Sequence, residues 1–98
     1  MTITKTADGD KLTIALEGLL DTVTAPDLEK ELKASLDGVT ELTFDFENLE
    51  YISSAGLRVL LIAQKTMNRQ GKMKVVHVAD IIMEIFEATG FTEMLTIE

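Results

Sequence analysis

Two adjacent hydroxyl side chains, Ser53 and Ser54, are the residues of this sequence best placed to do chemistry. They stand directly before an apolar run, where an extended segment is predicted to turn into a helix. Serine is a preferred N-cap because its oxygen accepts a hydrogen bond from a first-turn amide, so Ser53 is the expected cap. Ser54 then becomes an exposed first helical residue. Ala55 and Gly56 are expected to keep the backbone open to an approaching partner or enzyme.

The chemistry that this arrangement favours is phosphorylation. The first turn of a helix has unpaired N–H groups and a partial positive charge, both of which favour a phosphate. A phosphoryl group on Ser54 would add a charge of about −1.5 to −2 without a clash with the fold. The same helix end leaves weak nucleotide binding open as an alternative. No Gly-x-Gly-x-x-Gly or Walker-type loop supports that alternative, and Gly71-Lys72 is interpreted as a helix exit.

The helix after Ser54 is predicted to have a basic exposed stripe. At about 100° per residue, its apolar residues Leu57, Leu60, Leu61 and Met67 share the core side. The opposite side carries Ser54, Arg58, Ile62, Lys65 and Arg69. A phosphate on Ser54 could pair with Arg58 one turn away. The stripe is therefore predicted to belong to a partner-binding surface, and a merely solvated face is the alternative.

Other catalytic or metal-binding sets are poorly supported. The only histidine, His77, lies in Val75–Val78, a predicted strand, and a lone histidine there is more often structural. With no cysteine and no second histidine, neither a nucleophile–base triad nor a transition-metal site is expected. The carboxylates Asp45, Glu47 and Glu50 are expected to be divided between two faces as solvated groups. The sequence therefore predicts no catalytic residue, metal or cofactor.

The elements that must position these side chains follow from periodicity. Residues 2–6 and 11–17 alternate as strands, and Asp8-Gly9-Asp10 between them indicates a hairpin turn. A loop, Leu19-Leu20-Asp21, precedes a helix that Thr24 is expected to cap and that residues 37–38 end. The remaining expected elements are a strand at Leu42–Phe46, a helix at Ser54–Asn68, a strand at Met73–Val78, a helix at Asp80–Ala88 and, as an open alternative, a short strand at Leu95–Ile97. The predicted class is α/β, a mixed, mainly parallel sheet packed against helices in the order β-β-α-β-α-β-α.

Composition narrows the classes of partner. The 98 residues are expected to form one domain, residues 1–98. A net charge of −8 disfavours nucleic acid and anionic membrane surfaces, and it would steer the protein toward a basic partner. The chain has no cysteine for disulfides, no signal-peptide pattern at its start and no apolar stretch long enough to cross a bilayer, so no membrane insertion is expected. A cytoplasmic location is the expectation.

Four motifs together resemble the STAS domain family, and within it the bacterial anti-sigma factor antagonists. Ile52-Ser53-Ser54-Ala55-Gly56-Leu57, followed by an apolar helix, resembles the family signature. Glu17-Gly18 with Leu20-Asp21 is similar to the family's turn after the second strand. Phe44-Asp45-Phe46 with Leu49, and the segment Phe86–Phe91 that ends in Thr-Gly-Phe, resemble two further family segments. They occur in the family's order and cover nearly the whole chain.

The resemblance implies a phosphorylation-switched binding module and no enzyme. In that family the antagonist binds an anti-sigma factor that is also a serine kinase, and so frees a sigma factor. Phosphorylation of a serine breaks the complex, and a PP2C-type phosphatase resets it. Carried onto this chain, the phosphoacceptor is Ser54, and Ser53 is the less favoured second candidate. Ser53 departs from one common form of the family, in which an aspartate precedes the phosphorylated serine. The implied interface also includes Leu20 and Asp21. A structural STAS subunit of a lipid-transport or signalling complex, never phosphorylated, is the alternative.

Overall fold

The computed structural model describes all residues, 1–98, and consists of a four-stranded sheet with three helices. The elements are β1 (Thr2–Asp8), β2 (Lys11–Leu20), α1 (Ala25–Ser35), β3 (Glu41–Ile52), α2 (Ser54–Gln70), β4 (Lys72–Val76), α3 (Asp80–Thr89) and the 3₁₀ turn η1 (Phe91–Glu93). The strand order is β1-β2-β3-β4. The hairpin pair β1–β2 is antiparallel, whereas β2–β3 and β3–β4 are parallel. The predicted fold class and element order are confirmed.

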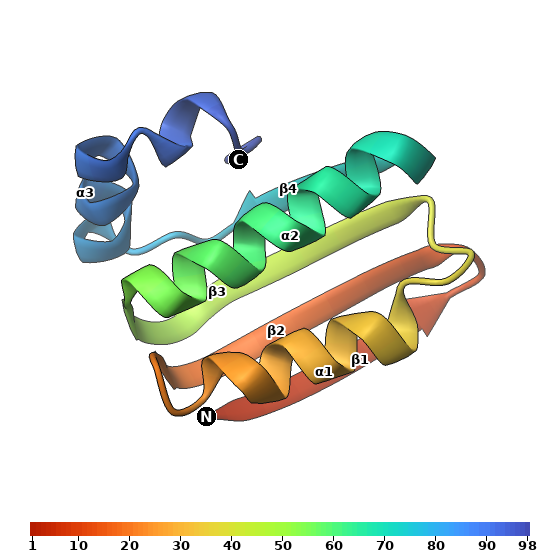
Figure 1. The fold of residues 1–98 in the computed structure, drawn as a ribbon, viewed down its shortest axis with the longest axis horizontal. Helices are drawn as coiled ribbons and strands as arrows, with labels where there is room; N and C mark the ends of the chain where they lie inside the picture. The colour runs from red at the N-terminus through yellow and green to blue at the C-terminus, as the bar shows by residue number, and fades with distance from the viewer.

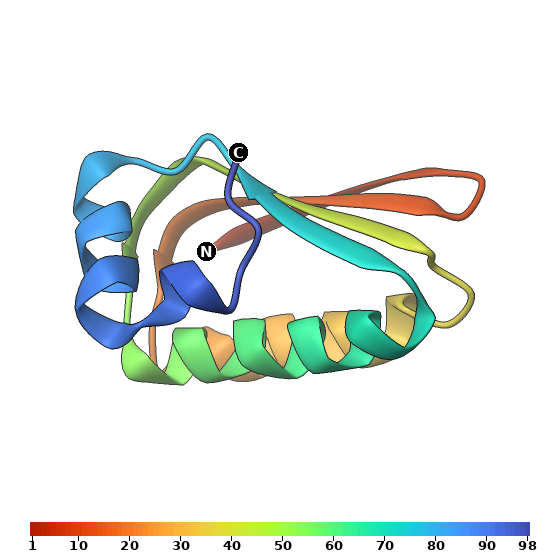
Figure 2. The ribbon, with the colours of Figure 1, turned by 90° about the horizontal axis from the view of Figure 1, so that it is seen from above.

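Helices α1 and α2 lie side by side on one face of the sheet, and no helix covers the opposite face (Figures 1 and 2). The apolar residues of the central strands alternate toward the helices, because successive side chains of a strand point to opposite faces. Leu12, Ile14 and Leu16 of β2 are buried in this way. None of the helices has both the length and the hydropathy that a membrane-spanning segment requires.

An aromatic row joins α3 to the rest of the core. The ring of Phe44 lies 5.9 Å from that of Phe46, which lies 6.4 Å from that of Phe86 on α3. All three side chains are fully buried. Helix α3 stands at the end of the sheet (Figure 2), and the Phe46–Phe86 pair of this row connects it to β3.

Strand β3 continues to Ile52, well beyond the predicted end at Phe46, and two bulges explain why the sequence pattern did not show its full length. The pairing runs from Ala15↔Asp45 to Glu17↔Asn48, so β3 has one extra residue over this stretch. A second extra residue falls between the pairs Gly18↔Leu49 and Leu19↔Tyr51. The buried positions after Phe46 are therefore Leu49 and Ile52, at spacing three, and this departure from alternation hides the strand in the sequence.

The other predicted boundaries differ less. β2 continues through Leu20, a residue predicted to lie in a loop. β4 ends at Val76, so the strand predicted through Val78 is too long, and His77 turns the chain with a φ of 58°. The segment after α3 forms η1 and a single bridge, Val75↔Ile97, where a short strand was an open alternative.

Candidate functional site

The two serines at the start of α2 occupy different environments. Ser53 is the N-cap, as predicted: its Oγ accepts a hydrogen bond from Gly56 N at 3.5 Å, and its backbone N–H donates to Leu20 O at 2.9 Å. Ser54 is the first helical residue, is exposed, and makes no side-chain hydrogen bond. The free hydroxyl at this helix end is thus that of Ser54.

Gly56 lies behind the serines in a close contact. It is buried, and a β-carbon added there would stand 2.7 Å from Leu20 Cγ and 2.8 Å from Ile52 Cγ1. The expectation that Gly56 leaves space for a partner is therefore wrong: the glycine lets α2 approach the ends of β2 and β3. Ala55 beside it is half-buried.

The loop between β2 and α1 is held by a reciprocal pair of hydrogen bonds. Asp21 Oδ1 accepts from the backbone N–H groups of Val23 at 3.0 Å and Thr24 at 3.1 Å. Thr24 Oγ1 in turn accepts from Asp21 N at 2.9 Å and donates to Leu19 O at 2.8 Å. Thr24 precedes α1 as predicted, but its side chain makes no capping bond because it is used in this loop.

These bonds also set the charge of Asp21. The N–H of Thr24, and less strongly that of Val23, stabilise the carboxylate and hold the pKa of Asp21 below its usual 3.8. Asp21 is therefore ionised at neutral pH, next to the helix end that displays Ser54.

The loop and the helix end lie at the same end of the molecule, where β2 and β3 finish (Figure 1). Leu19 and Tyr51 are paired across the two strands and are 47% and 44% exposed. Val23 in the loop is 82% exposed. Large apolar side chains exposed together at one end of a small protein are typical of a binding surface.

Leu20, in contrast, is fully buried. It was expected at the interface, but the structure places it beneath Gly56 in the core. The exposed apolar residues at this end are its neighbours Leu19, Val23 and Tyr51, none of which was among the predicted site residues. A signal existed, since Leu19 and Tyr51 each precede a core residue of a strand and so point the other way.

The predicted stripe on α2 is exposed. Arg58, Lys65 and Arg69 are exposed, none takes part in a salt bridge of the structure, and Ile62 between them is 37% exposed. Arg58 follows Ser54 by one helical turn. The structure thus brings Ser53, Ser54, Ala55 and Asp21 to one end, with the cationic stripe running away from it along α2.

His77 is not connected to either serine. Its Nδ1–H donates to Asp45 Oδ1 at 2.9 Å, which raises the pKa of His77 above its usual 6.5. Partial burial opposes ionisation of Asp45, but the hydrogen bonds from His77 and from Glu47 N outweigh it and lower the pKa of Asp45 below 3.8. No nucleophile–base pair is formed with a serine.

Comparison with known proteins finds a matching family and two similar proteins with related names. A model of the STAS domain family matches residues 2–98. BtrV of Bordetella bronchiseptica, named as a candidate anti-sigma factor antagonist, is 35% identical over an alignment of 88 residues; the match covers 88% of this chain and 76% of that protein. The anti-sigma-B factor antagonist of Staphylococcus aureus is 31% identical over an alignment of 84 residues; the match covers 84% of this chain and 78% of that protein.

Solved structures agree in fold. The anti-sigma factor antagonist SpoIIAA, in its unphosphorylated form, superimposes with a TM-score of 0.78 at 16% identity, covering 99% of this chain and 87% of that chain. The phosphorylated form of SpoIIAA, a Bacillus protein, gives a TM-score of 0.77 at 16% identity, covering 99% and 91%.

Proposed function

The chain belongs to the STAS domain family, and we propose that it acts as an anti-sigma factor antagonist controlled by phosphorylation of Ser54. In this role it binds an anti-sigma factor that is also a serine kinase, and the sigma factor is released. The observation that carries the proposal is the free, exposed hydroxyl of Ser54 at the first position of α2. Two sequence relatives that are named as anti-sigma factor antagonists support the proposal.

The proposed surface combines apolar and charged groups around Ser54. Leu19, Val23 and Tyr51 supply exposed apolar area at the strand ends. Asp21 supplies a fixed negative charge, and the stripe Arg58, Ile62, Lys65 and Arg69 extends the surface along α2. Apolar centres with charged surroundings are common in reversible protein interfaces. Leu20 supports this surface from beneath and does not contact the partner.

Phosphorylation would change this surface and leave the fold intact. A phosphoryl group on Ser54 faces the positive end of α2 and lies one turn from Arg58, whose charge is unpaired. The added charge of about −1.5 to −2 then neutralises Arg58 and repels acidic groups of the partner. The chain is in this account a substrate of the kinase and of a PP2C-type phosphatase, and it does not catalyse a reaction itself.

The proposal is tested by the affinity of the chain for its partner kinase in calorimetry. Ser54→Asp is expected to weaken binding by about tenfold or more, which corresponds to about 1.4 kcal/mol. Ser54→Ala is expected to bind like the unmodified chain. Thr92→Asp, which places the same charge on an exposed residue of η1, is the matched control and is expected to have no effect.

Equal affinity of Ser54→Asp and Ser54→Ala would contradict the switch. That result would favour the alternative of a constitutive STAS subunit of a lipid-transport or signalling complex. The Arg58→Glu, Lys65→Glu double variant tests the stripe separately: unchanged affinity would remove it from the interface. Calorimetry with ATP and GTP tests the remaining alternative of nucleotide binding, and no heat is expected.

A further inference from the structure

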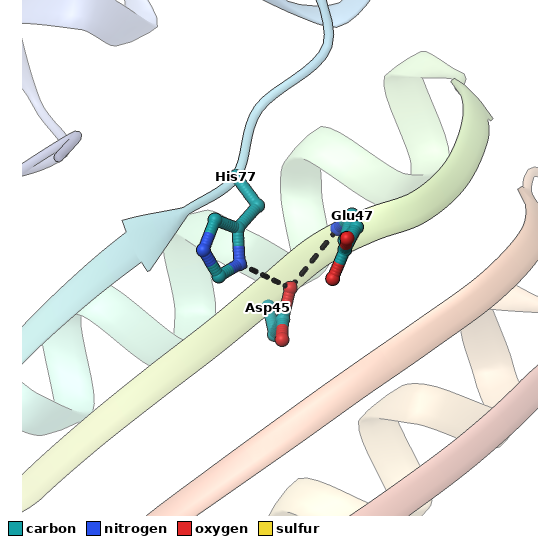
Figure 3. A group of neighbouring side chains, drawn as sticks. All are labelled: Asp45, Glu47 and His77. Atoms are coloured by element: carbon teal, nitrogen blue, oxygen red, sulfur yellow. Dashed lines mark hydrogen bonds and ion pairs between the residues drawn. The ribbon is translucent and has the colours of Figure 1, made fainter.

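A cluster of three ligand-bearing side chains lies away from the serines, where β3 meets the chain that leaves β4. One ligand atom from each of Asp45, Glu47 and His77 lies within 4.8 Å of the others (Figure 3). Asp45 and Glu47 are alternate residues of β3 and share a side of the strand. Of the three carboxylates Asp45, Glu47 and Glu50, which were expected to be divided between two faces, the structure brings Asp45 and Glu47 together.

The parallel pairing of β3 and β4 brings His77 to these carboxylates. Asp45 pairs with Val76, the last residue of β4, so His77 is the next residue along the chain. Its φ of 58° turns the chain out of the strand and directs the ring over β3 (Figure 3). Residues 32 positions apart in sequence thereby form a hydrogen bond of 2.9 Å between His77 Nδ1 and Asp45 Oδ1.

We propose that Asp45, Glu47 and His77 form a binding site for a divalent transition-metal ion of the Zn²⁺ class. Imidazole nitrogen and carboxylate oxygen suit Zn²⁺ and its neighbours, whereas Mg²⁺ and Ca²⁺ take oxygen ligands. Ligand atoms at bond lengths of about 2.0 to 2.2 Å around such an ion are about 3 to 3.5 Å apart. His77 Nδ1 and Asp45 Oδ1 are already about this close, at 2.9 Å. The exposed Glu47 carboxylate lies within 4.8 Å of both and would move closer to complete the set.

The site is open to solvent, which determines what it can do. The side chains of His77 and Asp45 are 60% and 27% exposed. Three protein ligands leave positions for water or for a group from another molecule. A bound ion would replace the proton of His77 Nδ1 and tie β3 to the segment between β4 and α3. This inference is independent of Ser54 and of the proposed switch.

Zn²⁺ titration of the full chain by calorimetry, in metal-free buffer at neutral pH, tests the site. The expected result is saturable binding of one ion per chain. His77→Ala, Asp45→Asn and Glu47→Gln are each expected to weaken binding at least tenfold. Glu50→Gln, which removes an exposed carboxylate from the same strand but outside the cluster, is the matched control and is expected to change the affinity less than twofold.

Circular dichroism verifies that each variant is folded, which is expected because the side chains are surface groups. A second readout is the NMR signal of the only imidazole in the chain, which should shift on Zn²⁺ addition and not on addition of equimolar Mg²⁺. No saturable binding, equal binding by His77→Ala, or equal competition by Mg²⁺ would each overturn the proposal.

Discussion

At the scale of single residues, neighbouring serines have separate tasks. Ser53 satisfies the amide of Gly56 at the start of α2, while Ser54 makes no side-chain hydrogen bond. The sequence could predict this division because a serine directly before an apolar helix is a strong N-cap signal. The burial of Leu20 continues the alternation of β2 and was missed because the strand was expected to end earlier. The exposure of Val23 could not be predicted, because it depends on how the loop folds.

The division predicts unequal effects on stability. Ser53→Ala should lower the free energy of unfolding by about 1 kcal/mol because the cap is lost. Ser54→Ala should change it by no more than about 0.5 kcal/mol, as is usual at an exposed position. Urea denaturation measures both. Ser53→Asp, which keeps a capping oxygen, should restore most of the loss, and a larger loss in Ser54→Ala would contradict the assignment.

The loop carboxylate of Asp21 predicts a pH dependence. Its pKa is lower in the folded state than the usual 3.8, so its ionised form adds stability above about pH 3.8, and this contribution is lost as pH falls through the lower, folded value. Asp21→Asn keeps an oxygen but cannot ionise. The free energy of unfolding of Asp21→Asn should be lower than that of the unmodified chain. This difference should be constant from pH 7 to 5 and should shrink as pH is lowered toward 3. A deficit that does not change with pH would contradict the role of the charge.

At the scale of elements, alternation and capping residues predicted most of the fold. The hairpin β1–β2 and the helix after Ser53 follow from apolar spacing and turn residues. The length of β3 could not be predicted, because its bulges shift the buried residues to spacing three. His77 was assigned to a strand because valines surround it, and its positive φ depends on the crossover to α3.

The close approach of α2 to the strand ends predicts a cost for a small added group. Gly56→Ala would place a β-carbon 2.7 Å from Leu20 Cγ and 3.0 Å from Leu20 O. Overpacking of this kind costs about 1 to 3 kcal/mol, partly offset by the better helix propensity of alanine. Thermal or urea denaturation should show the loss. A destabilisation no larger than that of Ser54→Ala would contradict the close contact.

At the scale of the molecule, one hydrophobic core joins the sheet to its helices, and the candidate sites occupy separate parts of its surface. α3 is attached through the buried Phe86, whose ring lies against that of Phe46 on β3. Phe86→Ala should therefore cost about 3 to 5 kcal/mol. Hydrogen exchange should show the largest loss of amide protection in α3, with smaller losses in α1; equal loss throughout would indicate that α3 is not a separately anchored element.

The switch at Ser54 is the central claim, and phosphosite mapping tests it most directly. The protein would be purified from its own cells during growth and under stress, and analysed by intact mass and peptide mapping. A population with one phosphoryl group, located on Ser54, is expected. A phosphoryl group on Ser53 or elsewhere with Ser54 unmodified, or no phosphorylation in any condition, would contradict it.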